Sequence, residues 1–475
     1  MTQYRPLAAV VLAAGEGTRM RSDTPKVLHP LCGRPMVLHV VDALAELPLE
    51  RIVIVVGHGA ERVTKTLQEQ LVTEIAVEFV EQRVQRGTGD AVSVALTLFD
   101  DLDAEDDILV LPSDAPLVRA ETIAKLATQH RVEDAAATVL TARASDTKGL
   151  GRVVRDKDDH VARIVEAADA TPEELEIDEI NTSIYCFRRN LLAPALRRLS
   201  PENAQGEYYL TDAVAVLRAA GHKVIAVSAE DPGEAIMVND RAQLAEAEAE
   251  LRARINRRWM QDGVTMVDSE RTYVDATVEI DPDVRILPGT ILEGRTSIGA
   301  GSVIGPDCHL VDAIVGERTR ISNAVVLDAE IGDDCNVGPF AYLRPGTRLA
   351  AGAKVGTYVE VKNSEIGEGT KVPHLSYVGD ADIGADANLG ASTITANYDG
   401  THKHRTKIGD GVHTSIHSSL VAPVELGDGS QTGAGAVVTH DVPPGMLVKG
   451  VPARVARPVR EDEPSDDESD DEGQQ

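Results

Sequence analysis

The segment Ile291-Leu-Glu-Gly-Arg-Thr-Ser-Ile-Gly-Ala-Gly-Ser-Val-Ile304 decides the fold of the second half of the chain. Its aliphatic residues Leu292, Ile298 and Ile304 are spaced by six, and a glycine follows Ile298. A helix repeats every 3.6 residues and a simple strand every two, so neither explains this spacing. One inward aliphatic residue in six is typical of hexapeptide repeats, which wind into a parallel β-helix. The sequence therefore predicts a coil of short, stacked strands.

The same spacing continues on both sides of this segment. The further residues that we expect to point into the coil are Ile280, Ile286, Leu310, Val315, Ile321, Leu327, Ile331, Val337, Leu343, Leu349, Val355, Val361, Ile366, Val372, Val378, Ile383 and Leu389. Occasional shorter steps mark turns of the coil that change register. The repeat fades near Val438, so we predict a β-helix domain over residues 263–445, followed by a C-terminal arm and tail over residues 446–475.

The first half of the chain has a different pattern, in which apolar runs alternate with amphipathic stretches. The runs that indicate strands are Ala8–Ala13, Arg51–Val56, Ala76–Val80, Ile108–Leu111 and Ala137–Thr141, with helical stretches between the first four. This alternation predicts a Rossmann-like α/β domain over residues 1–238, with parallel βαβ units and helices on both faces of an open sheet. A helix rich in Ala, Glu and Arg then links the two domains over residues 239–262.

The chain is strongly acidic, with a formal net charge of −30 over 475 residues. Nine carboxylates and no cation lie between Glu461 and Glu472, so we expect this tail to be disordered. A nucleic-acid partner needs a basic surface, and that class is excluded. The four cysteines form no CxxC pair, which favours reduced thiols. The apolar run at residues 6–15 is too short to span a membrane, and we expect a cytoplasmic protein without membrane contact.

A glycine-rich turn follows the first strand, in Leu12-Ala-Ala-Gly-Glu-Gly-Thr-Arg-Met20. Gly15 and Gly17 let the backbone approach a phosphate, whose oxygens consecutive N–H groups can bind. Arg19 and Lys26 add positive charge. The turn is neither a Walker loop nor a complete GxGxxG, and the glycine spacing alone is equally compatible with a simple turn.

Together with Pro25-Lys26, this string resembles the LxAGxGTRM…PK signature of the sugar-1-phosphate nucleotidyltransferases. The resemblance implies catalytic roles for Arg19 and Lys26, and a Mg²⁺ site at Asp114 and Asn239, whose oxygens suit this cation. It also implies a uracil-reading loop at Gln82 and residues 87–89. The residues that it implies for binding UTP and N-acetylglucosamine-1-phosphate are Leu12, Ala13, Ala14, Gly15, Lys26, Gln82, Gly87, Thr88, Gly151, Glu166, Asn181 and Asn239.

The second half carries its own ordered motifs. They are Arg344-Pro-Gly, Glu360-Val-Lys362, His374-Leu-Ser-Tyr377, Asn388-Leu-Gly-Ala391 and Asn397-Tyr-Asp-Gly400. With both motif sets in order, the chain from about Leu7 to about Val451 resembles the bifunctional N-acetylglucosamine-1-phosphate uridyltransferase/glucosamine-1-phosphate acetyltransferase family. That resemblance implies a left-handed β-helix and a homotrimer.

The same resemblance implies a second active site on the coil. His374 would be the general base, because an imidazole pKa lies near the operating pH, although His402, His404, His413 and His417 lie nearby in sequence. Glu360 would orient His374 or hold the substrate amine. Glucosamine-1-phosphate would be bound by Arg344, Lys362, Tyr377 and Asn388. Acetyl-CoA would lie between neighbouring subunits, near Ala391, Asn397, Tyr398 and Ala434.

Four positions depart from the family pattern. Ser113 stands where a glycine usually precedes the metal-binding aspartate, and Ser392 replaces the glycine after Ala391. Ile416 occupies the place of a serine that contacts the cofactor. Lys449, the cation expected beside the CoA phosphates, lies in a segment one residue shorter than usual. We therefore expect a small change at the uridylyl site and weaker binding of acetyl-CoA.

The resemblance implies two consecutive reactions that supply precursors of the bacterial cell wall. Acetyl-CoA would acetylate glucosamine-1-phosphate, and UTP would then convert the product into UDP-N-acetylglucosamine and pyrophosphate. Two other functions stay open at this point. One is a uridylyltransferase whose coil only forms trimers or binds an effector, and the other is a scaffold without activity, which the motif of Arg19, Lys26, Asp114 and Asn239 argues against.

Overall fold

The computed structural model describes residues 5–99, 105–143 and 147–458, so the acidic tail predicted at residues 461–472 lies outside the described residues. The chain forms two compact units, residues 1–251 and 252–475. The division falls inside helix α8, Arg241–Gln261, where the sequence predicted a connecting helix. The first half of α8 packs on the first unit through Leu244, Ala247 and Leu251.

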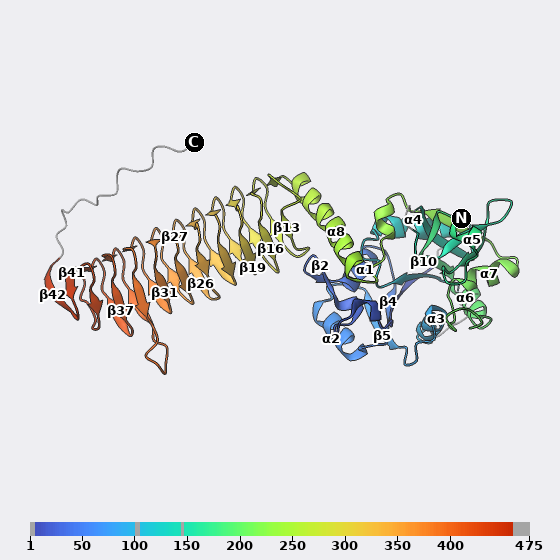
Figure 1. The fold of residues 1–475 in the computed structure, drawn as a ribbon, viewed down its shortest axis with the longest axis horizontal. Helices are drawn as coiled ribbons and strands as arrows, with labels where there is room; N and C mark the ends of the chain where they lie inside the picture. Colours follow the sequence, from blue (N-terminus) through green and yellow to red (C-terminus); the bar gives the residue numbers. More distant parts are fainter. Residues whose placement is uncertain (1–4, 100–104, 144–146, 459–475) are drawn as a thin grey trace. The chain divides into compact units, whose positions relative to one another are not determined.

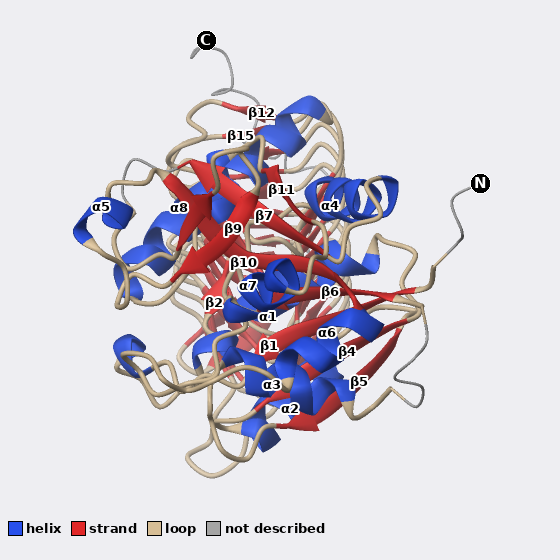
Figure 2. Ribbon diagram, turned by 90° about the vertical axis from the view of Figure 1, so that its right-hand side faces the viewer, coloured by secondary structure: helices blue, strands red, loops and turns tan. Residues whose placement is uncertain are grey.

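The first unit is built around a mixed β-sheet with the strand order β11-β7-β10-β6-β1-β4-β5 (Figure 2). Strand β8 pairs with β10, and β9 pairs with β8. Its strands are β1 Leu7–Ala13, β4 Arg51–Val56, β5 Ala76–Glu81, β6 Asp107–Pro112, β7 Ala137–Arg143, β8 Arg152–Arg155, β9 Val161–Val165, β10 Glu179–Arg188 and β11 Val224–Ser228. A separate pair is formed by β2 Pro30–Leu31 and β3 Arg34–Pro35.

The five predicted strands are all present, and β1, β4, β5 and β6 pair in parallel as predicted. The sequence analysis missed β10, which lies antiparallel between β6 and β7. After β7 the chain turns back through the β8–β9 hairpin instead of a crossover helix. Because only a long crossover returns a chain to the same direction, the next strand enters antiparallel, and the sheet is mixed.

Helices cover both faces of this sheet, as predicted. They are α1 Met36–Ala45, α2 Ala60–Gln70, α3 Thr88–Leu96, α4 Ala120–Val132, α5 Pro172–Leu175, α6 Arg189–Leu196 and α7 Asp212–Ala219, with 3₁₀ turns η1 Thr18–Met20, η2 Lys26–Leu28 and η3 Pro232–Ala235. Along β1, Ala9 and Val11 face the core beneath α1, α2 and α4. Ala8 and Val10 face the core beneath α3, α6 and α7. The strand is therefore buried on both faces, as parallel strands in such sheets are.

The second unit is the predicted β-helix, in which short strands stack into three parallel sheets along the coil (Figure 1). The first coil sheet contains β12 Thr265–Met266, β15 Arg285–Ile286, β18 Val303–Ile304, β21 Arg320–Ile321, β24 Asn336–Val337, β27 Lys354–Thr357, β30 Lys371–His374, β33 Asn388–Leu389, β36 His413–Thr414, β39 Gln431–Thr432, β41 Met446–Gly450 and β42 Ala453–Pro458. The second contains β13 Tyr273–Val274, β16 Ile291–Glu293, β19 His309–Val311, β22 Val325–Leu327, β25 Tyr342–Leu343, β28 Glu360–Lys362, β31 Tyr377–Gly379, β34 Ile394–Ala396, β37 Ser419–Val421 and β40 Val437–Val438. The third contains β14 Glu279–Ile280, β17 Ser297–Ile298, β20 Ile314–Val315, β23 Ala329–Ile331, β26 Thr347–Leu349, β29 Glu365–Ile366, β32 Ala381–Ile383, β35 Thr406–Ile408 and β38 Val424–Leu426.

The predicted inward residues are buried, with one exception. Leu327 is only half-buried, whereas Val326 is 0% exposed and pairs with Leu310 and Leu343 in the coils before and after it. The prediction of Leu327 was wrong because each coil must stack in register on its neighbours, and that register selects Val326. The stacked sheets are consistent with the left-handed coil that the sequence analysis expected.

One long loop interrupts the coil. Residues 397–405 leave it between β34 and β35 and return through a bridge between Tyr398 and Lys403; Figure 1 shows this loop in orange. The last parallel coil strand, β41, pairs with the antiparallel β42. All four cysteines of the chain are buried and none is in a disulfide.

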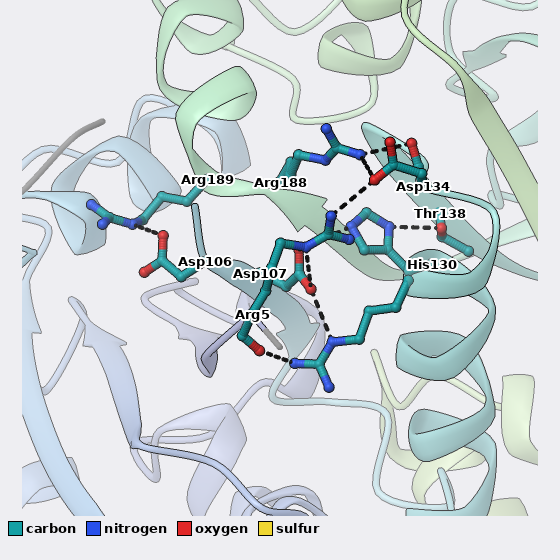
Figure 3. Close-up of polar contacts among 9 residues, drawn as sticks. Arg5, Asp106, Asp107, His130, Asp134, Thr138, Arg188 and Arg189 are labelled. Carbon is teal, nitrogen blue, oxygen red and sulfur yellow. Dashed lines mark hydrogen bonds and ion pairs between the residues drawn. The ribbon is translucent and has the colours of Figure 1, made fainter. Parts of the chain in front are cut away.

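A buried charge cluster anchors the first residue of β6 (Figure 3). Asp107 is 0% exposed, and its carboxylate lies 3.0 Å from Arg5 Nε, 3.1 Å from Arg131 Nε and 3.4 Å from His130 Nε2. Burial by itself raises the pKa of Asp107, but His130, Arg131 and Arg5 outweigh it and hold the pKa below 3.8, its ordinary value. Since β6 runs from this cluster to the edge of the sheet near Asp114, the cluster fixes the strand that carries that carboxylate.

We predict that Asp107→Asn lowers the free energy of unfolding of the first unit by about 3 kcal/mol, because it leaves buried cations without their partner. The Asp107 pKa is lower in the folded than in the unfolded chain, so its contribution is complete above about pH 3.8 and is lost as the pH falls. Urea unfolding of wild type and variant between pH 3 and 7 measures this difference. Asp134→Asn removes an exposed carboxylate from the same cluster and is expected to cost less than about 1 kcal/mol; equal losses in the two variants would contradict the prediction.

Candidate functional sites

The first unit has a pocket of 670 Å³ at the edge where β1 and β6 end. Parallel strands bring their carboxyl ends to one edge, which is where ligands bind in such sheets. The predicted residues that line it are Leu12, Ala14, Gly15, Lys26, Gln82, Gly87, Thr88, Asp114 and Glu166. Ala13 differs, since its methyl group is buried in the core below α1, and only its backbone is available to a ligand.

The glycine-rich turn packs directly against Lys26. Gly17 has a φ of 64°, and a Cβ at this position would lie 2.5 Å from the Cβ of Lys26. A side chain at Gly17 is therefore excluded by backbone conformation and by contact. Gly15 differs, because a Cβ there would meet no protein atom within 4 Å. Its missing side chain leaves the pocket open beside the backbone.

The predicted catalytic and metal-binding residues of this unit meet at one point. Lys26 Nζ contacts Asp114 Oδ2 and lies 2.8 Å from Asn239 Oδ1, which also accepts a hydrogen bond of 3.0 Å from Arg19 Nη2. Val238 N donates to the carbonyl of Asp114, which links the two segments. The Asp114 carboxylate and the Asn239 amide oxygen thus both contact the Lys26 ammonium group. These hard oxygen donors also fit a Mg²⁺ ion that keeps waters and phosphate oxygens as its other ligands.

The predicted sugar-binding residues form a second group in the same unit. Asn181 N donates to the carbonyl of Gly151 at 2.9 Å, and Asn181 Nδ2 donates to the Tyr185 hydroxyl at 2.7 Å. Glu166 Oε1 accepts a hydrogen bond of 3.0 Å from Thr211. Burial raises the pKa of Glu166, although the Thr211 hydrogen bond opposes this shift. A Cβ on Gly151 would lie 3.5 Å from Glu166 Oε2, so Gly151 and Glu166 are also neighbours.

The predicted uracil-reading residues lie between the end of β5, which Gln82 follows, and the start of α3 at Thr88. Gln82 Nε2 donates to the carbonyl of Gly87 at 3.2 Å and to Asp90 Oδ2 at 2.7 Å. Gly87 has a φ of 104°, and a Cβ there would lie 2.7 Å from the carbonyl oxygen of Tyr208. Thr88 Oγ1 accepts a hydrogen bond from Leu210 N at 3.0 Å. The loop is therefore held against residues 208–210.

That neighbouring segment was missed by the sequence analysis. Pocket-lining residues that it did not name include Tyr185, Gln205, Glu207, Tyr209 and Thr211. A signal was present, because the run Glu207-Tyr-Tyr-Leu-Thr-Asp212 places two adjacent tyrosines in a chain with only nine. Burial, with nearby carboxylates, raises the pKa of Tyr209 to about 12, so its hydroxyl stays protonated and able to donate at neutral pH.

In the second unit, Arg344, Lys362 and Tyr377, three of the four residues predicted for glucosamine-1-phosphate, lie on or beside neighbouring strands of the second coil sheet. Glu360 and Tyr377 pair in register on β28 and β31, and Arg344 follows β25 one coil earlier. Arg344 Nη1 donates to Glu360 Oε1 at 2.8 Å, and this contact raises the pKa of Arg344. Among the described residues no hydrogen bond joins Glu360 to His374, so the carboxylate orients Arg344 instead.

The Asp380 carboxylate is the common partner of a neighbouring group of polar side chains. Asn363 Nδ2 donates to it at 2.6 Å, Asn397 Nδ2 also donates to it, and Lys362 Nζ lies 3.8 Å away. Burial by itself raises the pKa of Asp380, but these neighbours outweigh it and hold the pKa below its ordinary value. Lys362 and Asn397, predicted to bind different substrates, therefore share one anchoring carboxylate.

Lys403 is the residue of this group that the sequence analysis missed. The ammonium group of Lys362 lies close enough to lower the pKa of Lys403. The run His402-Lys-His404 in the loop that carries Asn397 is a basic cluster within an acidic chain, and this was the available signal. Two lysines and Arg344 on one side of the coil make a local positive site for a phosphate.

His374 ends β30 at the corner between the first and second coil sheets. It is exposed, and no hydrogen bond to its imidazole is found among the described residues. Leu375 follows with a φ of 50° and turns the chain toward Tyr377, so the predicted base and Tyr377 flank one corner. Asn388 begins the next strand of the first coil sheet, and Ala391 follows that strand.

The predicted acetyl-CoA residues are spread along the coil beyond this corner. Tyr398 is 60% exposed, and its hydroxyl donates to the carbonyl of Gly400 at 2.6 Å. Ala434 follows β39, three strands beyond β30 in the first coil sheet. A pocket on the third coil sheet, lined by Glu330, Arg348 and Glu365 among others, contains none of these residues.

Comparison with known proteins covers both units. Residues 9–214 match the model of the MobA-like NTP transferase domain. The chain is 48% identical over 439 residues to the Bifunctional protein GlmU of Brevibacillus brevis, an alignment that covers 92% of this chain and 94% of that protein. It is 49% identical over 448 residues to the Bifunctional protein GlmU of Streptomyces avermitilis, with coverage of 94% and 92%. It is 48% identical over 440 residues to the Bifunctional protein GlmU of Desulfitobacterium hafniense, with coverage of 93% and 95%.

The chain belongs to the GlmU family. This confirms the resemblance found in the sequence. Within the part of the chain that the structure describes, no helix has the length and apolarity to cross a membrane.

The four positions that the sequence analysis set apart have different structural surroundings. Ser113 is buried without a positive φ, and its N–H donates to the carbonyl of Leu12 at 3.0 Å, so its extra atoms fit at the pocket edge. Ile416 is 51% exposed on the outside of the coil. Lys449 is exposed on β41 and pairs with Arg454 of β42.

Ser392 is the departure that strains the backbone. Its φ is 62°, at the corner that follows Ala391, whereas glycine adopts this conformation without a steric penalty. The left-handed conformation costs a residue with a Cβ about 1–2 kcal/mol.

We predict that Ser392→Gly raises the free energy of unfolding of the β-helix by about 0.5–1 kcal/mol, since relief of the strain exceeds the entropy that glycine adds to the unfolded chain. Thermal unfolding measures the change. Ser415→Gly is the matched control, because Ser415 has no positive φ and the same substitution should lower stability. Equal shifts in the two variants would contradict the role of backbone strain.

Proposed function

We propose that this chain catalyses two consecutive reactions, one in each unit. The second unit transfers an acetyl group from acetyl-CoA to glucosamine-1-phosphate. The first unit transfers a uridylyl group from UTP to N-acetylglucosamine-1-phosphate and releases pyrophosphate, which gives UDP-N-acetylglucosamine. The observation that carries the proposal is the similarity to proteins named bifunctional, which runs through both units. Supply of cell-wall precursors in a bacterium follows from this product.

In the uridylyl reaction, a phosphate oxygen of the sugar attacks the α-phosphorus of UTP. No covalent enzyme intermediate is needed, so positioning and charge neutralisation provide the catalysis. Lys26 and Arg19 supply positive charge for the triphosphate, and the turn with Gly15 offers backbone N–H groups. Asp114 and Asn239 would hold a Mg²⁺ ion, which would supply positive charge beside the phosphate oxygens. Glu166 and Asn181 position the sugar, and Gln82 with residues 87–88 selects uracil.

In the acetyl reaction, the amine of glucosamine-1-phosphate attacks the thioester carbon of acetyl-CoA, the carbon–sulfur bond breaks, and CoA leaves as its thiolate. His374 takes the proton that the amine loses, as an exposed imidazole near neutral pH is able to do. Arg344 and Lys362 hold the substrate phosphate, and Tyr377 and Asn388 hold the sugar. Ala391, Asn397, Tyr398 and Ala434 line the path of acetyl-CoA. Lys403 joins Lys362 as an additional cation for the phosphate.

A homotrimer is part of this proposal. Three large hydrophobic side chains on successive coils are exposed to solvent. They are Phe340, Tyr358 and Leu375, whose exposed fractions are 55%, 60% and 57%. The rings of Phe340 and Tyr358 stack with centroids 5.4 Å apart. Exposed apolar ridges of this kind mark protein contacts. Packing of coils against one another would cover this ridge near His374, where acetyl-CoA is proposed to bind.

Two separate assays test the proposal. CoA thiol release with glucosamine-1-phosphate reports acetyl transfer, and Mg²⁺-dependent pyrophosphate release from UTP with N-acetylglucosamine-1-phosphate reports uridylyl transfer. We predict that His374→Ala reduces thiol release about 10²–10⁴-fold, the usual effect of a general base, and leaves pyrophosphate release unchanged. Asp114→Asn should reduce only pyrophosphate release.

His309→Ala is a suitable control, because His309 lies on β19 of the coil and outside the proposed site. It should leave both activities at the wild-type level. If the wild type releases pyrophosphate but no thiol, the coil has only a structural role and the bifunctional proposal fails. If neither product forms, the chain is a scaffold.

A further inference from the structure

The ammonium group of Lys26 occupies the point where the two proposed metal ligands converge. Lys26 Nζ contacts Asp114 Oδ2 and lies 2.8 Å from Asn239 Oδ1. Arg19 Nη2 approaches the same Asn239 oxygen at 3.0 Å. Two positive groups thus hold the oxygens that the proposed function assigns to a divalent ion.

The surrounding chain builds this position for Lys26. Its side chain is 12% exposed and that of Asp114 is 14% exposed, so the ion pair is largely removed from water. Lys26 begins η2, and the turn at Gly17 packs against the lysine stem because glycine has no Cβ there. The contact therefore belongs to a packed site and is not a loose surface ion pair.

One point cannot hold an ammonium group and a divalent cation together. An ammonium hydrogen bond to oxygen is about 2.8 Å long and Mg²⁺–oxygen bonds are 2.0–2.1 Å long, so the two cations would overlap and repel each other. Lysine has a flexible four-carbon stem and can move its charge by several ångströms without movement of the backbone. A triphosphate in the adjoining pocket offers the lysine a new anionic partner.

We propose that Lys26 is an internal counter-cation that keeps free divalent ions out of the Asp114–Asn239 site until a nucleotide binds. The triphosphate draws Lys26 and Arg19 away from the two oxygens, and the metal then takes their place. Bound nucleotide therefore increases the affinity of the protein for the metal. This increase is larger than the metal–nucleotide complex that forms in solution accounts for. This inference rests on the proposed metal role of Asp114 and Asn239.

The test measures binding of Mn²⁺, a paramagnetic divalent probe, by electron paramagnetic resonance of the full-length protein. Without nucleotide, Lys26→Met should bind Mn²⁺ at least tenfold more tightly than the wild type, because the competing ammonium group is gone. Lys26→Gln, which keeps a polar end, should show the same gain and serves as a second variant if Lys26→Met folds poorly. In the double variant Lys26→Met/Asp114→Asn, the gain should disappear.

Arg21→Met is the matched control. Arg21 follows Arg19 by two residues, and no hydrogen bond joins its side chain to Asp114 or Asn239 among the described residues. This variant loses a positive charge from the same segment, so a gain equal to that of Lys26→Met would show a general charge effect and overturn the inference. Unchanged or weaker Mn²⁺ binding by both Lys26 variants would also overturn it.

A further arm separates this inference from the proposed function. With UTP present and sugar phosphate absent, the wild type should bind Mn²⁺. The variant Asp114→Asn should not bind it under the same conditions. If this binding occurs but the Lys26 variants show no gain without UTP, only the counter-cation role fails. If Asp114→Asn has no effect on Mn²⁺ binding with UTP, the metal role of Asp114 fails, and the inference fails with it.

Discussion

Parallel pairing of strands in register determines where the candidate functional side chains of both units lie. In the first unit, β1 and β6 run side by side, so the turn with Gly15 and the carboxylate of Asp114 reach the same edge of the sheet. In the second unit, stacking of coil on coil aligns Glu360 with Tyr377 and Thr357 with His374. Residues far apart in sequence become neighbours because hydrogen bonds between parallel strands fix their relative positions.

Local positive charge is the second common feature, and it stands out in a chain of net charge −30. Lys26 and Arg19 gather around Asp114 and Asn239 in one unit, while Lys362 and Lys403 gather around Asp380 in the other. In each case a partly buried carboxylate holds the cations in place. An acidic protein that handles phosphorylated substrates needs such local sites, because its overall field repels them.

Sequence reasoning was most reliable where a short-range pattern carries the information. Almost every residue that the six-residue period assigned to the inside of the coil is buried. The exception is Leu327, because the adjacent apolar residues Val326 and Leu327 are distinguished only by the register of neighbouring coils. Sequence reasoning missed β10, whose antiparallel course depends on the β8–β9 hairpin before it. It missed Tyr209, Thr211 and Lys403 because their roles arise from loops that fold onto distant segments.

The sequence by itself determined the two fold classes, the connecting helix and the motifs that identify the family, since periodicity and motif order are properties of the linear chain. Tertiary structure alone decided which charged groups meet. It placed the Lys26 ammonium between Asp114 and Asn239, paired Glu360 with Arg344 instead of His374, and put Ser392 in a left-handed conformation. These outcomes depend on distances between atoms that lie far apart in sequence, and no local pattern of residues encodes those distances.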